Sequence, residues 1–178
     1  PDEEVARDFI LFEAPDVTVV VVDATCLERN LNLVLQVLEI TPKTVVCVNL
    51  MDEARRQHLV VDTDKLAAEL GVPAVPCVAR SSKGLDILKD AILNITTGHT
   101  ATFPRPVCYS PDIEMAVAVL TEELLPLAPQ LSPRWFALRL LEQDESILQH
   151  FLTEDRISTS TPLRQLASAT KKVAPWFS

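Results

Sequence analysis

The uniformly apolar run at residues 17–22 constrains the fold of this 178-residue chain more than any other feature. It reads VTVVVV, so both faces of an extended strand would carry β-branched side chains, and Asp23 ends the run. A strand with one solvated face alternates polar and apolar residues, whereas a strand of a parallel sheet is apolar throughout. The run therefore predicts a strand of a parallel sheet that is covered on both faces.

Helical patterns and two further strand-like runs alternate with this strand. Strands are expected at 44–48 and about 74–78, and helices from Asp2 to the residue before Pro15, over 27–38, over 62–70 and over 84–95. Pro76 cannot donate a hydrogen bond to a neighbouring strand, so the third strand is expected at an edge of the sheet. Strands and helices that alternate over short connections predict right-handed βαβ units and an α/β fold.

The pattern changes after residue 97. Thr, Gly, His and Pro replace the periodic apolar residues over 98–105, which predicts a linker. Pairs of a helix-capping residue and a first-turn proline then occur at 110–111, 132–133 and 161–162. Such pairs are typical of helix starts. We therefore expect an α/β domain at 1–97 and a small all-α subdomain at 106–178.

The composition excludes several classes of function. A formal charge of −9 argues against a nucleic-acid partner and against attraction to an anionic membrane surface. No apolar run reaches the roughly 18 residues that span a bilayer. The cysteines at 26, 47, 77 and 108 and the histidines at 58, 99 and 150 have no metal-ligand spacing. We therefore expect a reducing compartment and no metal site in this chain.

Asn49 and Asp52 follow the second expected strand in the stretch TVVCVNLMDEA. Ligands of parallel sheets bind outside the carboxyl ends of the strands. A carboxylate there can accept two hydrogen bonds from guanine, one from the ring N1–H and one from the 2-amino group. Adenine would leave the carboxylate unpaired, and a site built on such pairing can reject the wrong base by roughly 10⁴. Asn49 can hold the neighbouring loop through side-chain-to-backbone bonds and can reach the other edge of the base.

Val78, Ala79 and Arg80 leave the third strand at the same edge of the sheet. A small residue in this loop would let a backbone N–H approach the guanine O6. Two loops would then enclose one base. The spacing alone leaves an alternative open, in which Asp52 merely begins or caps a local helix and Asn49 is a turn residue.

The order of these pieces resembles the second half of a small GTPase domain of the P-loop NTPase class. More narrowly, it resembles the cytosolic GTPase of the bacterial ferrous iron transport protein B family. The stretches that carry the resemblance are residues 1–9, VVDATCLERNLNLVLQVLE at 21–39, NLMDEA at 49–54, 62–92, and WFALRLLEQD at 135–144.

The resemblance implies a role for each part of the chain. Asn49, Leu50, Met51 and Asp52 match the guanine-specificity motif, and Val78, Ala79 and Arg80 match the second base-contacting loop. Generic GTPases have Lys at the position of Leu50, and an apolar residue there is common in this family. Residues 1–12 match the segment around the second switch. Residues from about 106 match the helical domain that joins the GTPase to the membrane portion and modulates nucleotide release.

The phosphate-handling half of such a site is not in these 178 residues. The sequence contains no G-x-x-x-x-G-K-[ST], and its glycines stand only at 71, 84 and 98. In the family the phosphate loop, the first switch and the D-x-P-G motif would precede Pro1. That loop cradles the phosphates and its Ser or Thr holds Mg²⁺, so we expect Mg²⁺ only in the intact domain. This chain alone is expected to bind nucleotide weakly and not to hydrolyse GTP.

The resemblance predicts the cytosolic region of a bacterial ferrous iron transporter, in which GTP binding and hydrolysis are coupled to Fe²⁺ uptake. The expected partners are GTP or GDP and the membrane portion of the same transporter at the cytoplasmic side of the inner membrane. The first strand would present a flat apolar edge, which favours self-association. The alternatives are a GTPase of the translation or ribosome-assembly type, which usually keeps Lys after the Asn, and a non-nucleotide α/β interaction module.

Overall fold

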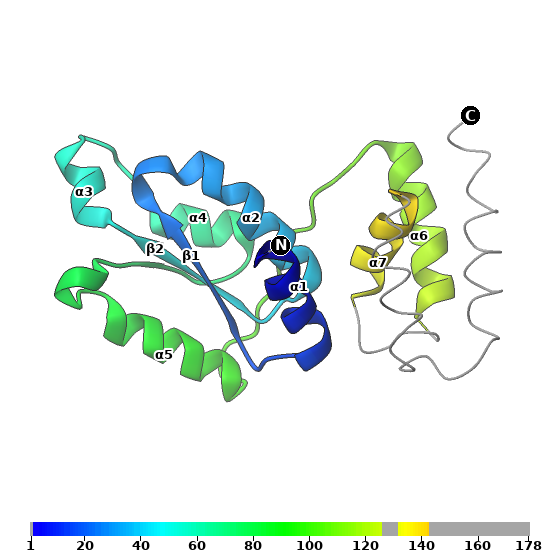
Figure 1. Cartoon of the computed structure of the whole chain (residues 1–178), viewed down its shortest axis with the longest axis horizontal. Coiled ribbons are helices and arrows are strands. Elements are labelled where there is room, and N and C mark those ends of the chain that lie inside the picture. The colour runs from blue at the N-terminus through cyan, green and yellow to red at the C-terminus, as the bar shows by residue number, and fades with distance from the viewer. Residues whose placement is uncertain (1, 126–131, 143–178) are drawn as a thin grey trace. The chain divides into compact units, whose positions relative to one another are not determined.

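The computed structural model describes residues 2–125 and 132–142, and the chain divides into two compact units, 1–107 and 108–178. The helices and strands of the first unit are α1 (Asp2–Glu13), β1 (Thr18–Asp23), α2 (Leu27–Ile40), β2 (Thr44–Asn49), α3 (Met51–Arg56), α4 (Thr63–Leu70), β3 (Ala74–Pro76) and α5 (Leu85–Thr96) (Figure 1). Short 3-10 turns follow β1 at Ala24–Cys26 and β3 at Ala79–Ser81. The predicted alternation of strands and helices is present, with the short helix α3 added after β2 and with β3 ending at Pro76 instead of at about residue 78.

The three strands form a parallel sheet in the order β1-β2-β3. Thr18 pairs with Thr44 at one end, and Asp23 pairs with Asn49 at the other, so the carboxyl ends of β1 and β2 lie level. Pro76 ends β3 at the edge of the sheet, as predicted. Helices α2 and α4 lie on one side of the sheet and α5 lies on the other (Figure 1). The predicted α/β fold with a parallel sheet is confirmed.

Each face of the sheet has its own apolar core. On one face, Val20, Val22, Val46 and Val48 pack with residues of α2 and α4. On the other face, Val45, Cys47, Val75 and Cys77 pack against Ile95 of α5. The central strand β2 is therefore buried on both faces, as an all-apolar strand of a parallel sheet should be.

The first strand is covered on only one face in the described part of the chain. Val20 and Val22 are 5% and 1% exposed, whereas Val19 and Val21, which point to the α5 side, are 36% and 58% exposed. The prediction that this run is buried on both faces is therefore wrong for the described residues. The physical reason is that β1 is an edge strand and α5 covers β2 and β3.

Cys47 and Cys77 are buried free thiols in the core beneath α5, whereas Cys26 and Cys108 are exposed. Burial, together with the neighbouring Cys77 thiol, raises the pKa of the Cys47 thiol to about 12. At neutral pH Cys47 is therefore a neutral, apolar-like group that fills space in the core.

Helix α4 begins and ends at residues that the sequence marks. The Asp62 carboxylate accepts a hydrogen bond from the Lys65 N–H at 2.9 Å, and Gly71 ends the helix with φ +74°. A Cβ at Gly71 would lie 1.9 Å from the carbonyl oxygen of Phe103. The N–H groups of Phe103 and Arg105 donate to the carbonyls of Gly71 and Leu70. The last residues of the segment predicted as a linker, 98–105, are thus bonded to the end of α4.

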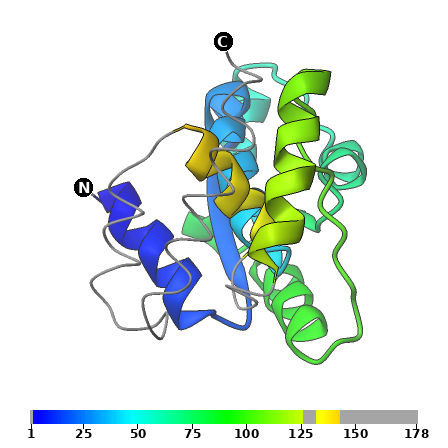
Figure 2. The same ribbon diagram turned by 90° about the vertical axis from the view of Figure 1, so that its right-hand side faces the viewer.

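The second unit contains α6 (Pro111–Leu124) and α7 (Pro133–Leu141), which lie side by side (Figure 2). Both helices begin at a predicted proline, and Ser132 accepts a hydrogen bond from the Trp135 N–H at 3.4 Å. Phe136 is 1% exposed, so it is a core residue here. The predicted start at 161–162 lies outside the described residues. None of the helices within the described ranges has the length and hydropathy needed to cross a bilayer.

Glu114 and Arg134 join the two helices of this unit. Both carboxylate oxygens of Glu114 accept hydrogen bonds from the Arg134 guanidinium at 2.8 Å. The Tyr109 N–H adds a third bond to the same carboxylate at 2.9 Å. The Arg134 hydrogen bonds, followed by the Tyr109 N–H, lower the pKa of Glu114 to about 2. A bidentate pair of this kind fixes the relative orientation of the two helices.

Candidate functional site

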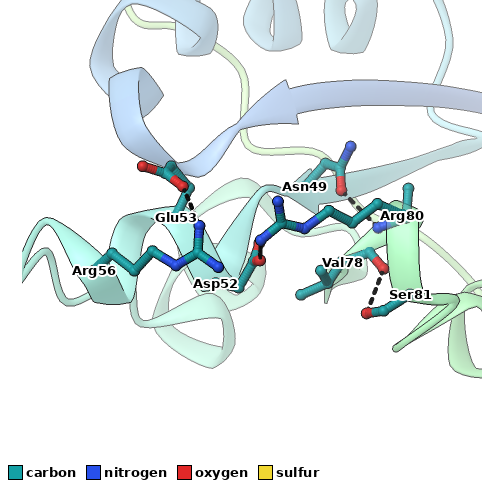
Figure 3. A network of polar contacts seen from close by, with 8 residues as sticks. Asn49, Asp52, Glu53, Arg56, Val78, Arg80 and Ser81 are labelled. Atoms are coloured by element: carbon teal, nitrogen blue, oxygen red, sulfur yellow. Dashed lines mark hydrogen bonds and ion pairs between the residues drawn. The ribbon is translucent and has the colours of Figure 1, made fainter.

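The predicted site residues occupy two loops at the carboxyl end of the sheet (Figure 3). Asn49 is the last residue of β2, and Asp52 lies in the first turn of α3. Leu50 between them has φ 60° and ψ 30°, a left-handed conformation that turns the chain from strand to helix within one residue. Ala79 and Arg80 lie in the short turn that follows β3.

Backbone and amide hydrogen bonds tie the two loops together. The Ala79 N–H donates to the side-chain oxygen of Asn49 at 3.0 Å. The Met51 N–H donates to the Cys77 carbonyl at 3.2 Å, and the Cys77 N–H donates to the Val48 carbonyl at 2.8 Å. Asn49 thus makes the side-chain-to-backbone bond that its position in the sequence predicts. As a result, the Ala79 N–H at the small residue is already engaged within the protein.

Asp52 pairs with Arg80, which is 28 residues later in the chain. The Arg80 Nη2 donates to the Asp52 Oδ2 (Figure 3). The other oxygen, Oδ1, is buried and has no hydrogen-bond partner among the described residues. Partial burial opposes ionisation of Asp52, but the Arg80 hydrogen bond and charge, together with the backbone N–H groups of Asp52 and Glu53, outweigh it and hold the pKa of this carboxyl below its usual value. The site therefore contains an ionised carboxylate whose Oδ1 has no partner at normal hydrogen-bond geometry among the described residues.

The seven predicted residues differ in what they present. Asn49, Asp52, Ala79 and Arg80 come together with their polar groups in contact. Met51 and Val78 are 8% and 7% exposed and pack in the core on the α2 and α4 side, so only their backbone borders the site. Leu50 is 37% exposed, and its apolar side chain supplies no hydrogen-bonding group to the site.

Asp52 also fits the alternative that the spacing leaves open, because it stands in the first turn of a helix. Its carboxylate nevertheless bonds across to the next loop rather than only to its own turn. A helix-start residue needs no such partner. The contact with Arg80 therefore links Asp52 to the loop after β3, which a residue that only begins a helix would not do.

Asp23 lies beside Asn49 at the carboxyl end of the sheet, and no functional role was predicted for it from the sequence. Its Oδ1 accepts bonds from the backbone N–H and the hydroxyl of Thr25, both at 2.7 Å. These bonds hold the pKa of Asp23 below its usual value, the hydroxyl bond having the larger effect. Asn30 then accepts from the Asp23 N–H at 3.2 Å. The D-x-T spacing after a strand is the signal that could have predicted this turn. Asp23 is therefore committed to its own turn.

A cavity of about 850 Å³ lies between the start of α2 and the segment that leads into α4. Its wall is mostly apolar and includes Leu31, Leu35, Leu59 and Leu66. None of the seven predicted residues lines it. This hollow is thus separate from the Asn49–Asp52 corner.

Comparison with known proteins gives the context of this geometry. Residues 1–92 match the family model described as ferrous iron transport protein B, and residues 109–173 match the model described as the FeoB cytosolic helical domain. A Porphyromonas gingivalis protein named Fe(2+) transport protein A/Fe(2+) transporter FeoB fusion protein is 37% identical over 152 residues, which are 83% of this chain and 18% of the relative. The chain thus spans about a fifth of the length of the curated relatives it matches.

Solved structures of S. thermophilus NFeoB are also similar. A mutant described as bound to mGDP has a TM-score of 0.76 and 31% identity, over 99% of this chain and 66% of that one. The form described as bound to mGMPPNP has the same TM-score and identity, over 99% and 64% of the two chains.

The sheet, its covering helices and the helical unit after them define a GTPase-type α/β domain of the P-loop NTPase class followed by a helical domain. Within this class, the chain belongs to the ferrous iron transport protein B family.

Proposed function

We propose that this chain is the base-recognising part of a guanine-nucleotide site that regulates ferrous iron uptake. In this proposal Asp52 accepts the N1–H and the 2-amino group of guanine, and Asn49 holds the loop of Val78, Ala79 and Arg80 against the base. Leu50 and Met51 shape the backbone of the specificity motif. GTP and GDP are the ligands, and the membrane portion of the same transporter is the partner.

The observation that carries this proposal is the half-used carboxylate of Asp52. Its Oδ1 is buried without a hydrogen-bond partner among the described residues, and an unpaired buried acceptor costs free energy. A ligand edge with two donors would satisfy both carboxylate oxygens. The guanine nucleotides named for the S. thermophilus relatives are ligands with such an edge.

Phosphate and metal chemistry are not assigned to residues of this chain. Among the described residues, no group of three or more Asp, Glu, His or Cys side chains could hold a metal ion. We propose that Mg²⁺ and the phosphates are held by the phosphate loop of an intact domain. The 178-residue chain by itself should then give no Mg²⁺-dependent release of phosphate from GTP, and turnover above a buffer blank would contradict this.

We propose that the second unit, which matches the cytosolic helical domain, connects the nucleotide site to the membrane portion. The location would then be the cytoplasmic side of a bacterial inner membrane. The net charge of −9 gives no support to an RNA-binding GTPase of the ribosome-assembly type.

A non-nucleotide interaction module is the second candidate, because an Asp52–Arg80 ion pair could simply hold two loops together. Competition between nucleotides separates the two proposals. We expect GDP to displace labelled GDP at far lower concentration than ADP does, on a chimera in which this chain follows the phosphate-binding half of an NFeoB relative. Asp52→Asn should remove this preference. Equal competition by ADP would refute the base-site assignment and favour the interaction module.

A further inference from the structure

Two groups expected to meet the base, the Asp52 carboxylate and the Ala79 N–H, are engaged with other groups of the protein in this structure. Arg80 donates to the Asp52 carboxylate, and the Ala79 N–H donates to Asn49. We propose that Arg80 is an internal competitor of guanine: its guanidinium occupies the Asp52 carboxylate and must leave before the base can bind. This inference rests on the proposed guanine site and concerns how that site is controlled.

The competition follows from the shape of the two donors. A guanidinium presents parallel N–H groups in one plane, which match the two oxygens of a carboxylate. The N1–H and the 2-amino group of guanine form a similar pair of donors on one flat edge. One carboxylate can accept only one such edge at a time, so Arg80 and guanine exclude each other on Asp52.

Arg80 fills this place incompletely. It bonds Oδ2 and leaves Oδ1 buried without a partner among the described residues. Guanine would bond both oxygens, so exchange improves the pairing of Asp52. The side chain of Arg80 is 56% exposed, and its guanidinium can return to water at little cost. The pair is therefore weak enough to be displaced and strong enough to lower the affinity for the base.

Guanosine is the suitable probe because it carries no charge and needs no phosphate loop. Its binding to the 178-residue chain can be followed by ligand-observed NMR, with inosine and adenosine as comparisons. Arg80→Ala should raise the guanosine affinity about two- to fivefold, the range expected for loss of an exposed ion pair. Arg80→Gln, which keeps the bulk of the side chain, should act in the same direction.

Salt provides a second readout. Added salt weakens the Arg80–Asp52 pair and does not act on a neutral ligand, so the wild-type affinity for guanosine should increase with ionic strength. Arg80→Ala should make the affinity independent of salt. Arg56→Ala is the matched control: Arg56 also pairs with an acidic neighbour, Glu53 at 3.1 Å, within α3, the helix that carries Asp52. It should change neither quantity.

The possible results distinguish this inference from the proposed function. Unchanged or weaker guanosine binding in both Arg80 variants would overturn the competitor role while leaving the base site intact. Loss of binding in Asp52→Asn supports the base site, and inosine should bind more weakly than guanosine because it lacks the 2-amino group. If Asp52→Asn binds guanosine as well as the wild type does, the proposed function fails and the inference fails with it.

Discussion

The Ala79 N–H donates a hydrogen bond to the side-chain oxygen of Asn49, 3.0 Å away and 30 residues earlier in the chain. This bond joins the loops that follow β2 and β3. Asn49→Ala should therefore lower the free energy of unfolding by about 0.5–1.5 kcal/mol, the usual net value of one hydrogen bond. It should also speed hydrogen exchange at the Ala79 amide. Asn32→Ala, at an exposed position of α2, should do neither. Unaltered exchange at Ala79 would show that the bond does not hold the loop in solution.

The Glu114–Arg134 pair predicts acid sensitivity of the helical unit. Glu114 has a pKa of about 2 in the folded chain against an ordinary 4.5, so it contributes stability above pH 4.5. This contribution is lost as the pH falls from about 4.5 to 2. Because the pair is about one-third exposed, we expect a loss of no more than about 1 kcal/mol.

This acid sensitivity can be measured by urea unfolding at a series of pH values between 2 and 6. In Glu114→Gln the slope of stability against pH over the same range should be smaller. Direct titration of the Glu114 carboxyl by NMR gives an independent check, and an ordinary pKa there would contradict the predicted effect.

Two glycines with the same backbone angle allow the close contact at Gly71 to be separated from conformational strain. Gly71 and Gly98 both have φ +74°, but a Cβ at Gly98 would meet nothing within 4 Å. Gly98→Ala should cost about 1 kcal/mol for the left-handed conformation alone. Gly71→Ala should cost at least about 1 kcal/mol more because its Cβ collides with the Phe103 carbonyl. Equal losses in chemical denaturation would mean that the 103–105 segment is free to move away.

The exposed edge of β1 predicts self-association. Val19 and Val21 are 36% and 58% exposed on β1, whose outer side pairs with no strand in the part of the chain that the structure describes. We expect the mass of the 178-residue chain in sedimentation to rise with concentration. Val21→Lys should suppress this rise, because a charge at a strand edge opposes pairing with another strand.

Val60→Lys is the matched control for the β1 edge. Val60 is 95% exposed and lies outside the sheet, so its replacement should leave the association unchanged. A chain that stays monomeric at all concentrations would refute the prediction that the β1 edge mediates self-association.

Much of the architecture could be predicted because local signals and burial agree. The VTVVVV run became β1, and residues such as Asp62 and Ser132 start helices where they were expected. Helix α3 was predicted only as an alternative, in which Asp52 begins a local helix, since six residues are too short for a helical period to appear. The exposure of Val21 was also missed, because a sequence shows that a strand is apolar but not which neighbours cover it.

The candidate site likewise contains contacts that could be predicted from the sequence and contacts that could not. The position of Asn49 at the end of a strand could be predicted from the sequence, and so could its bond to the next loop. The pairing of Asp52 with Arg80 could not, because it depends on how two loops 28 residues apart meet at one sheet edge. Side-chain partners across loops are set by tertiary packing, which local spacing does not encode.

The four cysteines differ in their accessibility to thiol reagents, so their reaction rates report on local opening of the fold. Cys26 and Cys108 are exposed, one in each compact unit, so a thiol-alkylating reagent should modify them in the folded chain. Cys47 and Cys77 are covered by α5 and should react only when that layer opens. The rate of alkylation at the second pair therefore measures how often α5 lifts from the sheet, without any added label.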